Sequence, residues 1–113
     1  MKRNLNEPSM LPEYKKVLDT FGLKYAGDVH YNWVHYNWNG YWLVSYYSDK
    51  DFCIWAVMKG IRKECIKNAP FTVLGACEQI SPEELEERIS DIIKKYNQVK
   101  EEIKLEKLQK DFK

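Results

Sequence analysis

A capped heptad pattern in the last third of the chain most constrains how this sequence can fold. Ser81, Pro82 and Glu84 occupy the N-cap, first and third positions of a predicted helix, a combination that favours a helix start. Apolar residues then recur in steps of four and three, at Leu85, Ile89, Ile92, Tyr96, Val99 and Ile103. This spacing is typical of a helix that packs along one seam, and it predicts a long amphipathic helix over residues 81–113.

The length of this helix predicts self-association. A helix of about 30 residues spans about 45 Å, whereas a compact chain of this size has a radius of gyration near 13 Å. An overhanging seam would leave Val99 and Ile103 in water, so we expect a homodimer, held together in coiled-coil fashion by the six seam residues named above. The alternative is a helix that lies across its own sheet as far as about Tyr96 and ends in a solvated tail.

The N-terminal part of the chain predicts a short helix followed by strands. Apolar residues recur at helical spacing at Leu11, Tyr14, Leu18 and Phe21. This pattern predicts a helix over about 11–21, preceded by a flexible segment over 1–10. Residues 29–59 are rich in Tyr, Trp, Val and Ile and are interrupted by short polar signals, as expected of strands.

Asn39-Gly40 is the clearest turn signal in this strand region. A two-residue type I′ turn needs positive φ at both positions, and Asn-Gly tolerates that best. The turn should join a strand near 30–38 to one near 41–48. After a second turn at Asp49-Lys50, further strands are expected near 52–59, 61–67 and 71–78, of which 61–67 could instead be a short helix. The whole chain, 1–113, is therefore expected to be one α+β domain: an antiparallel meander of three to five strands between a short helix and a long one.

The register implied by the two turns assigns side chains to the two faces of the sheet. The more aliphatic face should carry Val34, Tyr36, Leu43, Phe52, Ile54, Ala56 and Met58. The more aromatic face should carry Tyr31, Trp33, His35, Asn37, Trp42, Val44, Tyr46, Cys53, Trp55 and Val57. From the second face we select a candidate binding surface, consisting of Tyr31, Trp33, His35, Trp42, Tyr46 and Trp55. The alternative is that a helix, or the segment Phe71–Leu74, covers this face.

Metal and catalytic chemistry find little support in the sequence. The repeat His30-Tyr31-Asn32-Trp33 and His35-Tyr36-Asn37-Trp38 places two histidines five residues apart, so on a regular strand they point to opposite faces. The cysteines at 53, 65 and 77 form no CxxC pair and are expected to be reduced. No nucleophile elbow, phosphate-binding glycine loop or paired-carboxylate motif occurs. We therefore expect no enzyme activity, no metal and no cofactor.

Charge gives weak support to nucleic-acid binding. The formal net charge is only +1, although aromatic residues, which can stack on bases, make up 14% of the chain. One small cluster, consisting of Lys59, Arg62, Lys63 and Lys67, could contact phosphates or an acidic partner. A nucleotide or a single-stranded nucleic acid therefore remains the alternative ligand for the aromatic face.

The function expected from the sequence is that of a small, cytoplasmic, non-enzymatic interaction protein. No apolar leader and no membrane-spanning run occur in the sequence given. The size and composition resemble those of small accessory proteins of phages and other mobile elements. That resemblance of type implies an inhibitor or a sequestering protein that binds a protein partner.

Overall fold

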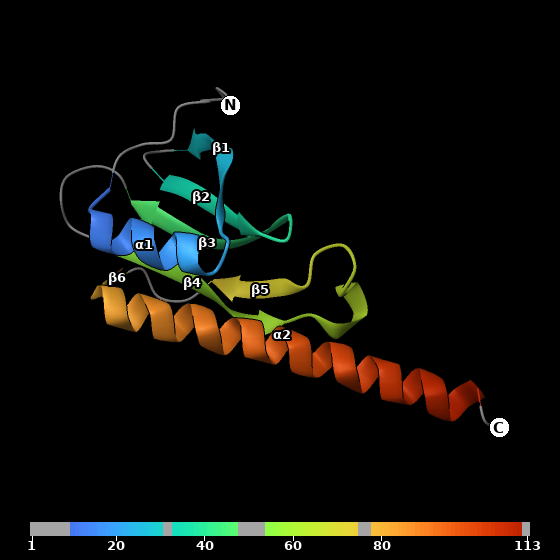
Figure 1. Ribbon diagram of the computed structural model, residues 1–113. Coiled ribbons are helices and arrows are strands. Elements are labelled where there is room, and N and C mark those ends of the chain that lie inside the picture. The colour runs from blue at the N-terminus through green and yellow to red at the C-terminus, as the bar shows by residue number, and fades with distance from the viewer. Residues whose placement is uncertain (1–9, 31–32, 48–53, 75–77, 112–113) are drawn as a thin grey trace.

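The computed structural model describes residues 10–30, 33–47, 54–74 and 78–111, which form an α+β fold (Figure 1). In chain order the elements are α1 (Pro12–Thr20), β1 (Lys24–His30), β2 (Trp33–Trp38), β3 (Tyr41–Tyr47), β4 (Ile54–Ile61), η1 (Lys63–Cys65), β5 (Phe71–Leu74), β6 (Glu78–Gln79) and α2 (Pro82–Asp111). The prediction of an antiparallel sheet between a short and a long helix is confirmed. The expected flexible segment and the Asp49-Lys50 turn lie outside the described residues, apart from Met10.

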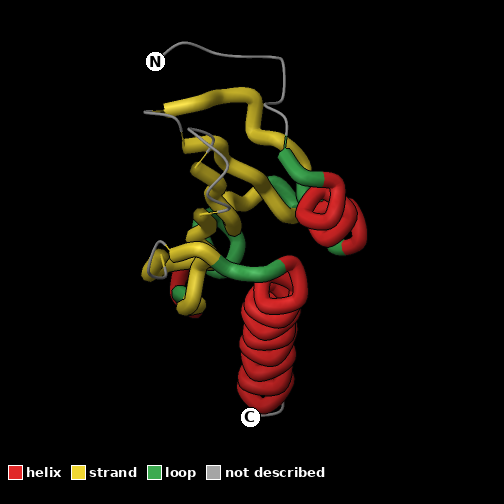
Figure 2. The backbone as a smooth tube through the Cα atoms, turned by 90° about the vertical axis from the view of Figure 1, so that its left-hand side faces the viewer, coloured by secondary structure: helices red, strands yellow, loops and turns green. Residues whose placement is uncertain are grey.

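The six described strands form an antiparallel sheet in the order β1, β2, β3, β4, β5, with β6 also paired to β4. Both helices lie on the same side of this sheet (Figure 2). Tyr14 of α1 stacks on Trp55 of β4 with ring centroids 5.4 Å apart, and Tyr96 of α2 meets Trp38 of β2 edge to face at 5.2 Å. We call the sheet face that meets the helices the inner face and the opposite one the outer face.

The turn between β2 and β3 has the predicted backbone geometry. Asn39 and Gly40 have φ values of 52° and 81°, as a type I′ turn requires. The paired strands have an irregular register, because Tyr36 pairs with Val44 whereas the next residue, Asn37, pairs with Trp42. Leu43 is therefore the extra residue of a β-bulge.

Two parts of the strand prediction are wrong. β1 begins at Lys24, ahead of residues 29–59, the region to which the sequence pattern assigned the first strands. The chain continues as an edge strand there, with Gly27 at a φ of 89° and an irregular register between Tyr25 and Val29. The segment 61–67, expected to be a strand, instead contains the short 3₁₀ helix η1, which was the stated alternative.

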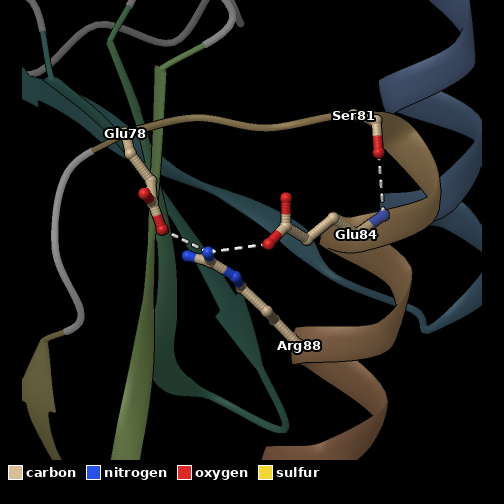
Figure 3. Close-up of polar contacts among 4 residues, drawn as sticks. All are labelled: Glu78, Ser81, Glu84 and Arg88. Atoms are coloured by element: carbon tan, nitrogen blue, oxygen red, sulfur yellow. Dashed lines mark hydrogen bonds and ion pairs between the residues drawn. The ribbon is translucent and has the colours of Figure 1, made fainter.

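The start of α2 is tied to the sheet by a polar network (Figure 3). The Ser81 hydroxyl accepts a hydrogen bond from the Glu84 backbone N–H at 3.2 Å, which confirms the predicted N-cap. Arg88, one turn farther along, donates to the carboxylates of Glu84 and of Glu78 in β6. The helix start is therefore held both by its own cap and by an ion pair to an edge strand.

This ion pair predicts a pH-dependent contribution to stability. The hydrogen bond and the charge of Arg88 lower the pKa of the Glu78 carboxyl below its ordinary value of 4.5. A carboxyl group whose pKa is lower in the folded than in the unfolded state stabilises the fold. This stabilisation is complete at a pH above the ordinary pKa, and it is lost as the pH falls through the folded-state pKa. We therefore expect Glu78→Gln to lower Tm slightly at pH 7, and the Tm difference from wild type to shrink as the pH falls below the ordinary carboxyl pKa.

Thermal melts at several pH values check this expectation. Glu83→Gln is the matched control, because it removes a carboxylate from the same region and no ion pair of Glu83 is seen among the described residues. A Tm difference between wild type and Glu78→Gln that stays constant from pH 7 to about pH 3 would contradict the assignment.

The seam of α2 packs mainly on the chain's own sheet. Leu85, Ile89, Ile92 and Tyr96 are all buried, whereas Val99 and Ile103 are half-buried. Glu106, the next position of the same seam, pairs with Lys63 of η1 at 2.6 Å. The premise that the whole seam needs a second copy is therefore wrong for its first four residues, because the inner face already covers them. Self-association itself stays a prediction.

Candidate functional site

The outer face of the sheet carries a group of aromatic side chains from β2 and β3. Residues of paired positions share a face, so the pairs Trp33–Tyr47, His35–Ser45 and Asn37–Trp42 place these side chains together on the outer face. We call Trp33, His35, Trp42 and Tyr47 the outer aromatic surface. Between Trp33 and Tyr47 the sequence contains no Lys, Arg, Asp or Glu, so β2 and β3 contribute none of these four side chains to the face.

The bulge at Leu43 determines which way Trp42 points. In a regular strand residues three apart lie on opposite faces, so Trp42 and Ser45 could not meet. The extra residue shifts the alternation by one, and the Trp42 indole N–H donates a hydrogen bond to the Ser45 hydroxyl at 2.9 Å. A backbone irregularity thus sets the orientation of an exposed Trp side chain.

His35 completes the support of Trp42. Its Nδ1 lies 2.8 Å from the Ser45 hydroxyl, and its ring meets the Trp42 indole edge to face with centroids 4.9 Å apart. Because the Trp42 N–H can only donate, the Ser45 oxygen accepts from it, and the Ser45 hydroxyl hydrogen is then available to an unprotonated Nδ1. The indole is therefore fixed from below by a hydrogen bond and from the side by a ring.

Trp42 nevertheless remains open to solvent. Its side chain is 41% exposed, whereas the Ser45 beneath it is 1% exposed. Beside it on the outer face, Trp33 and Tyr47 are half-buried and contact each other with ring centroids 5.2 Å apart. The site is therefore a fixed aromatic surface that has Trp42 as its most exposed member.

Two residues of the predicted binding surface do not belong to it. Tyr46 and Trp55 pair with each other across β3 and β4, but on the inner face, where they are 7% and 0% exposed. Trp55 stacks on Tyr14 of α1, so the alternative interpretation, cover by a helix, is correct for these two. The prediction failed because it assumed a strictly regular register across the turn, and the bulge reverses the faces beyond Leu43.

The remaining face assignments change for the same reason. Val44 and Val57 lie on the inner face with Val34 and Tyr36, and Ala56, which pairs with Ser45, lies on the outer face. The positions of Tyr31, Phe52 and Cys53 lie outside the described residues. Trp33, His35 and Trp42 therefore remain together, and Ser45 and Tyr47 join them as residues that the sequence pattern missed. The adjacent aliphatic pair Leu43-Val44 was the available signal, because it breaks the alternation of β3.

The four candidate cations near η1 do not converge on this surface. Arg62 donates a hydrogen bond to the Thr72 hydroxyl at 3.0 Å, and Lys63 pairs with Glu106, whose hydrogen bond raises the pKa of the Lys63 ammonium. Lys67 is exposed, and its carbonyl accepts a hydrogen bond from Tyr41. Lys59 lies beside α2, where its backbone carbonyl accepts a hydrogen bond from the Lys95 ammonium at 3.4 Å. The cluster seen in the sequence is therefore dispersed over several contacts.

Ser45 and His35 are residue types that form nucleophile–base pairs in enzymes, but the Ser45 hydroxyl is not exposed to solvent. A serine nucleophile must reach its substrate, and the Ser45 side chain is covered by Trp42 and its neighbours.

Among the described residues, no three His, Cys, Asp or Glu side chains are grouped so as to hold a metal ion. In the part of the chain that the structure describes, no helix is long and apolar enough to cross a membrane.

In comparisons with known proteins, no family model, no curated protein and no solved structure matches this chain.

Proposed function

We propose that this protein is a non-enzymatic interaction protein that binds a protein partner through its outer aromatic surface. One observation carries the proposal: Trp42 is exposed yet held in a single orientation by Ser45 and His35. Trp is enriched among the residues that dominate binding energy at protein interfaces. A Trp whose orientation is already fixed loses little side-chain freedom on binding, which lowers the entropic cost of association.

The composition of the surface also supports a protein partner. It combines large rings with His35, and the Asn37 amide lies beside it on the same face. The sequence between Trp33 and Tyr47 contains no Lys, Arg, Asp or Glu. Cores of protein interfaces are enriched in aromatic residues and depleted of Lys, Glu and Asp. In its most concrete form the proposed role is that of a cytoplasmic inhibitor or sequestering protein, which occupies a surface that its partner needs for other contacts.

A nucleotide or single-stranded nucleic acid is the second candidate ligand. The exposed Trp42 ring favours it, since every base can stack on an aromatic side chain. Such binders also need cations that follow the phosphate backbone. The dispersed contacts of Arg62 and Lys63 argue against that arrangement, so we place the protein partner first.

Affinity capture from the native host tests the proposal. Wild-type protein should retain a specific polypeptide, and Trp42→Ala should reduce the retained amount at least about tenfold. Leu11→Ala is the matched control, because Leu11 is a 48% exposed apolar residue at the start of α1, on the other side of the sheet, and its loss should leave capture unchanged. Mass spectrometry identifies the polypeptide, and circular dichroism confirms that both variants are folded.

Two results would contradict the protein-binding proposal. One is equal capture of the same polypeptide by wild type and Trp42→Ala. The other is retention on single-stranded DNA that falls steeply with salt and is lost in Trp42→Ala, which would assign the surface to nucleic acid.

A further inference from the structure

The polar contacts below Trp42 form a short chain of three groups. The Trp42 indole N–H donates to the Ser45 hydroxyl at 2.9 Å, and the same hydroxyl lies 2.8 Å from Nδ1 of His35. An indole N–H can only donate, so the Ser45 oxygen accepts from Trp42 and its own hydrogen points to Nδ1. While Nδ1 is unprotonated, two hydrogens occupy the two contacts and all three groups are satisfied.

Protonation of His35 adds one hydrogen too many to this chain. A protonated imidazole carries hydrogen on both ring nitrogens, so Nδ1 changes from an acceptor into a donor. The Ser45 oxygen can accept from both rings, but its own hydrogen has then lost its acceptor. Ser45 is 1% exposed, and its hydroxyl has no third partner among the described residues. A buried donor without an acceptor is costly, so the protonated arrangement is unfavourable with all three side chains in place.

Trp42 is the member of the chain that can leave. Its side chain is 41% exposed, so rotation about its side-chain bonds brings the indole N–H to water. Ser45 then accepts from His35, and its hydroxyl hydrogen can reach water through the space that Trp42 has opened. The edge-to-face contact of the two rings, at 4.9 Å, opposes this movement, because an indole attracts a cation. That attraction is weak at an exposed Trp, so the unsatisfied hydroxyl decides the direction.

Few charged groups face His35 from the neighbouring strands. The titratable side chains of β3 are phenols, which as a class ionise at about pH 10, and Ala56 of β4 follows Ser45 on the outer face. The β1 residues opposite His35 are 26–28, of which Asp28 is charged, and Lys24 and His30 stand at the two ends of β1. A charge on β1 changes the pH at which His35 takes up its proton, but it leaves the number of hydrogens at Ser45 unchanged.

We propose that His35 is a pH-sensitive switch for Trp42: the unprotonated ring holds the indole in one orientation through Ser45, and the protonated ring releases it. Histidine is the side chain whose charge ordinarily changes between about pH 5 and 8. The inference rests on the proposed function and adds its regulation. A partner that recognises the fixed indole binds well when His35 is neutral and poorly when it is charged.

NMR spectroscopy of the free protein tests the switch without a partner. Trp42→Phe assigns the Trp42 indole N–H signal, and the ring signals of His35 report its protonation. Between about pH 7.5 and 5.5 the heteronuclear NOE of the Trp42 indole nitrogen should fall with the midpoint of the His35 titration, because the released side chain becomes mobile. The indole signal of Trp55, which is completely buried, should stay unchanged and so exclude unfolding as the cause.

His35→Asn and His30→Gln are the matched variants. Asn places an amide near the position of Nδ1, so it can accept from Ser45 at either pH and does not titrate. In His35→Asn the Trp42 indole should therefore stay fixed throughout. His30→Gln removes the other histidine of the chain and should leave the wild-type response in place. An unchanged mobility of the Trp42 indole in wild type, or a change that persists in His35→Asn, would overturn the inference.

Capture of the partner from the host separates this inference from the proposed function. Wild type should retain at least about fivefold less partner at the lower pH, and His35→Asn should retain equal amounts, because affinity follows the fraction of molecules in the competent state. An equal fall in both proteins would overturn the regulation and leave protein binding in place. Capture that is insensitive to Trp42→Ala would contradict the proposed function and the regulation of binding together, whereas the switch itself is decided by the spectra.

Discussion

Trp55→Ala is expected to lower the free energy of unfolding by about 3–5 kcal/mol. The Trp55 ring is completely buried and packs between Tyr14 of α1, at 5.4 Å, and Tyr46 of β3, at 4.6 Å between ring centroids. Its removal leaves a cavity where α1 meets the sheet. For a domain near 100 residues, each kcal/mol changes Tm by about 4 °C, so we expect a fall of about 12–20 °C in a thermal melt.

Two control variants show whether burial is the cause. Trp42→Ala removes the same side chain from the outer face and should cost no more than about 2 kcal/mol, because Trp42 is 41% exposed and loses one hydrogen bond. Trp55→Phe keeps a ring between the two tyrosines. It gives up no hydrogen bond, since the Trp55 N–H has no partner among the described residues, so its cost should be well below that of Trp55→Ala. Equal costs for Trp55→Ala and Trp42→Ala would mean that the inner and outer faces are wrongly assigned.

These two Trp residues also show where prediction from the sequence stopped working. Both were expected on one aromatic face, because alternation along a strand assigns faces reliably only while the register is regular. One extra residue at Leu43 was enough to send Trp55 into the core and leave Trp42 outside. The composition of the site was therefore predictable, but its division between the two faces depended on a bulge that hairpin rules do not specify.

Local signals, by contrast, were sufficient for the helices and for one turn. The Ser81 cap and the Asn39-Gly40 turn act within a few residues, so their chemistry can be recognised without knowing the rest of the fold. The edge strand β1 depends on pairing with β2 and contains Gly27 at positive φ, which in the sequence alone is typical of a turn. A cavity lies beside Trp42, where the β2–β3 turn meets residues 68–71, and no local pattern predicts such a meeting.

Ile89→Glu is expected to remove most of the free energy of unfolding. Ile89 is completely buried in the α2 seam, so a carboxylate there would lose its hydration without gaining an ion-pair or hydrogen-bond partner. Measured costs of this kind exceed about 4 kcal/mol, against a total of about 5–15 kcal/mol for a domain of this kind. Leu108→Glu makes the same change on the same helix at a position that is 53% exposed, and in dilute, monomeric protein it should leave Tm within about 2 °C of wild type. Similar melts for the two variants would show that the first part of α2 is not packed on the sheet.

The exposure of residues near the end of α2 also changes where we expect the dimer contact to lie. Leu105 and Leu108 are 57% and 53% exposed and lie three residues apart, and Leu105 is about 200° around the helix from Ile103, so the two leucines point away from the seam. The end of α2 runs past the sheet (Figure 1), and the whole molecule, α2 included, is 58 Å long. Its exposed sides carry acidic and basic residues in equal number between Lys100 and Lys107, a pattern that an antiparallel second copy can complement.

We therefore expect a dimer held by the exposed stripe of Leu105 and Leu108 rather than by the buried seam. Light scattering at about 100 µM should give twice the monomer mass of 13.5 kDa, and the double variant Leu105→Glu, Leu108→Glu should give the monomer mass while its circular dichroism spectrum stays that of a folded protein. Lys104→Glu alone changes charge without removing apolar surface, and it should weaken the dimer far less, because exposed ion pairs contribute little. A wild-type protein that is monomeric at this concentration would exclude self-association through α2. In that case the Lys63–Glu106 ion pair and the half-buried Val99 and Ile103 would suffice to hold the helix end against its own domain.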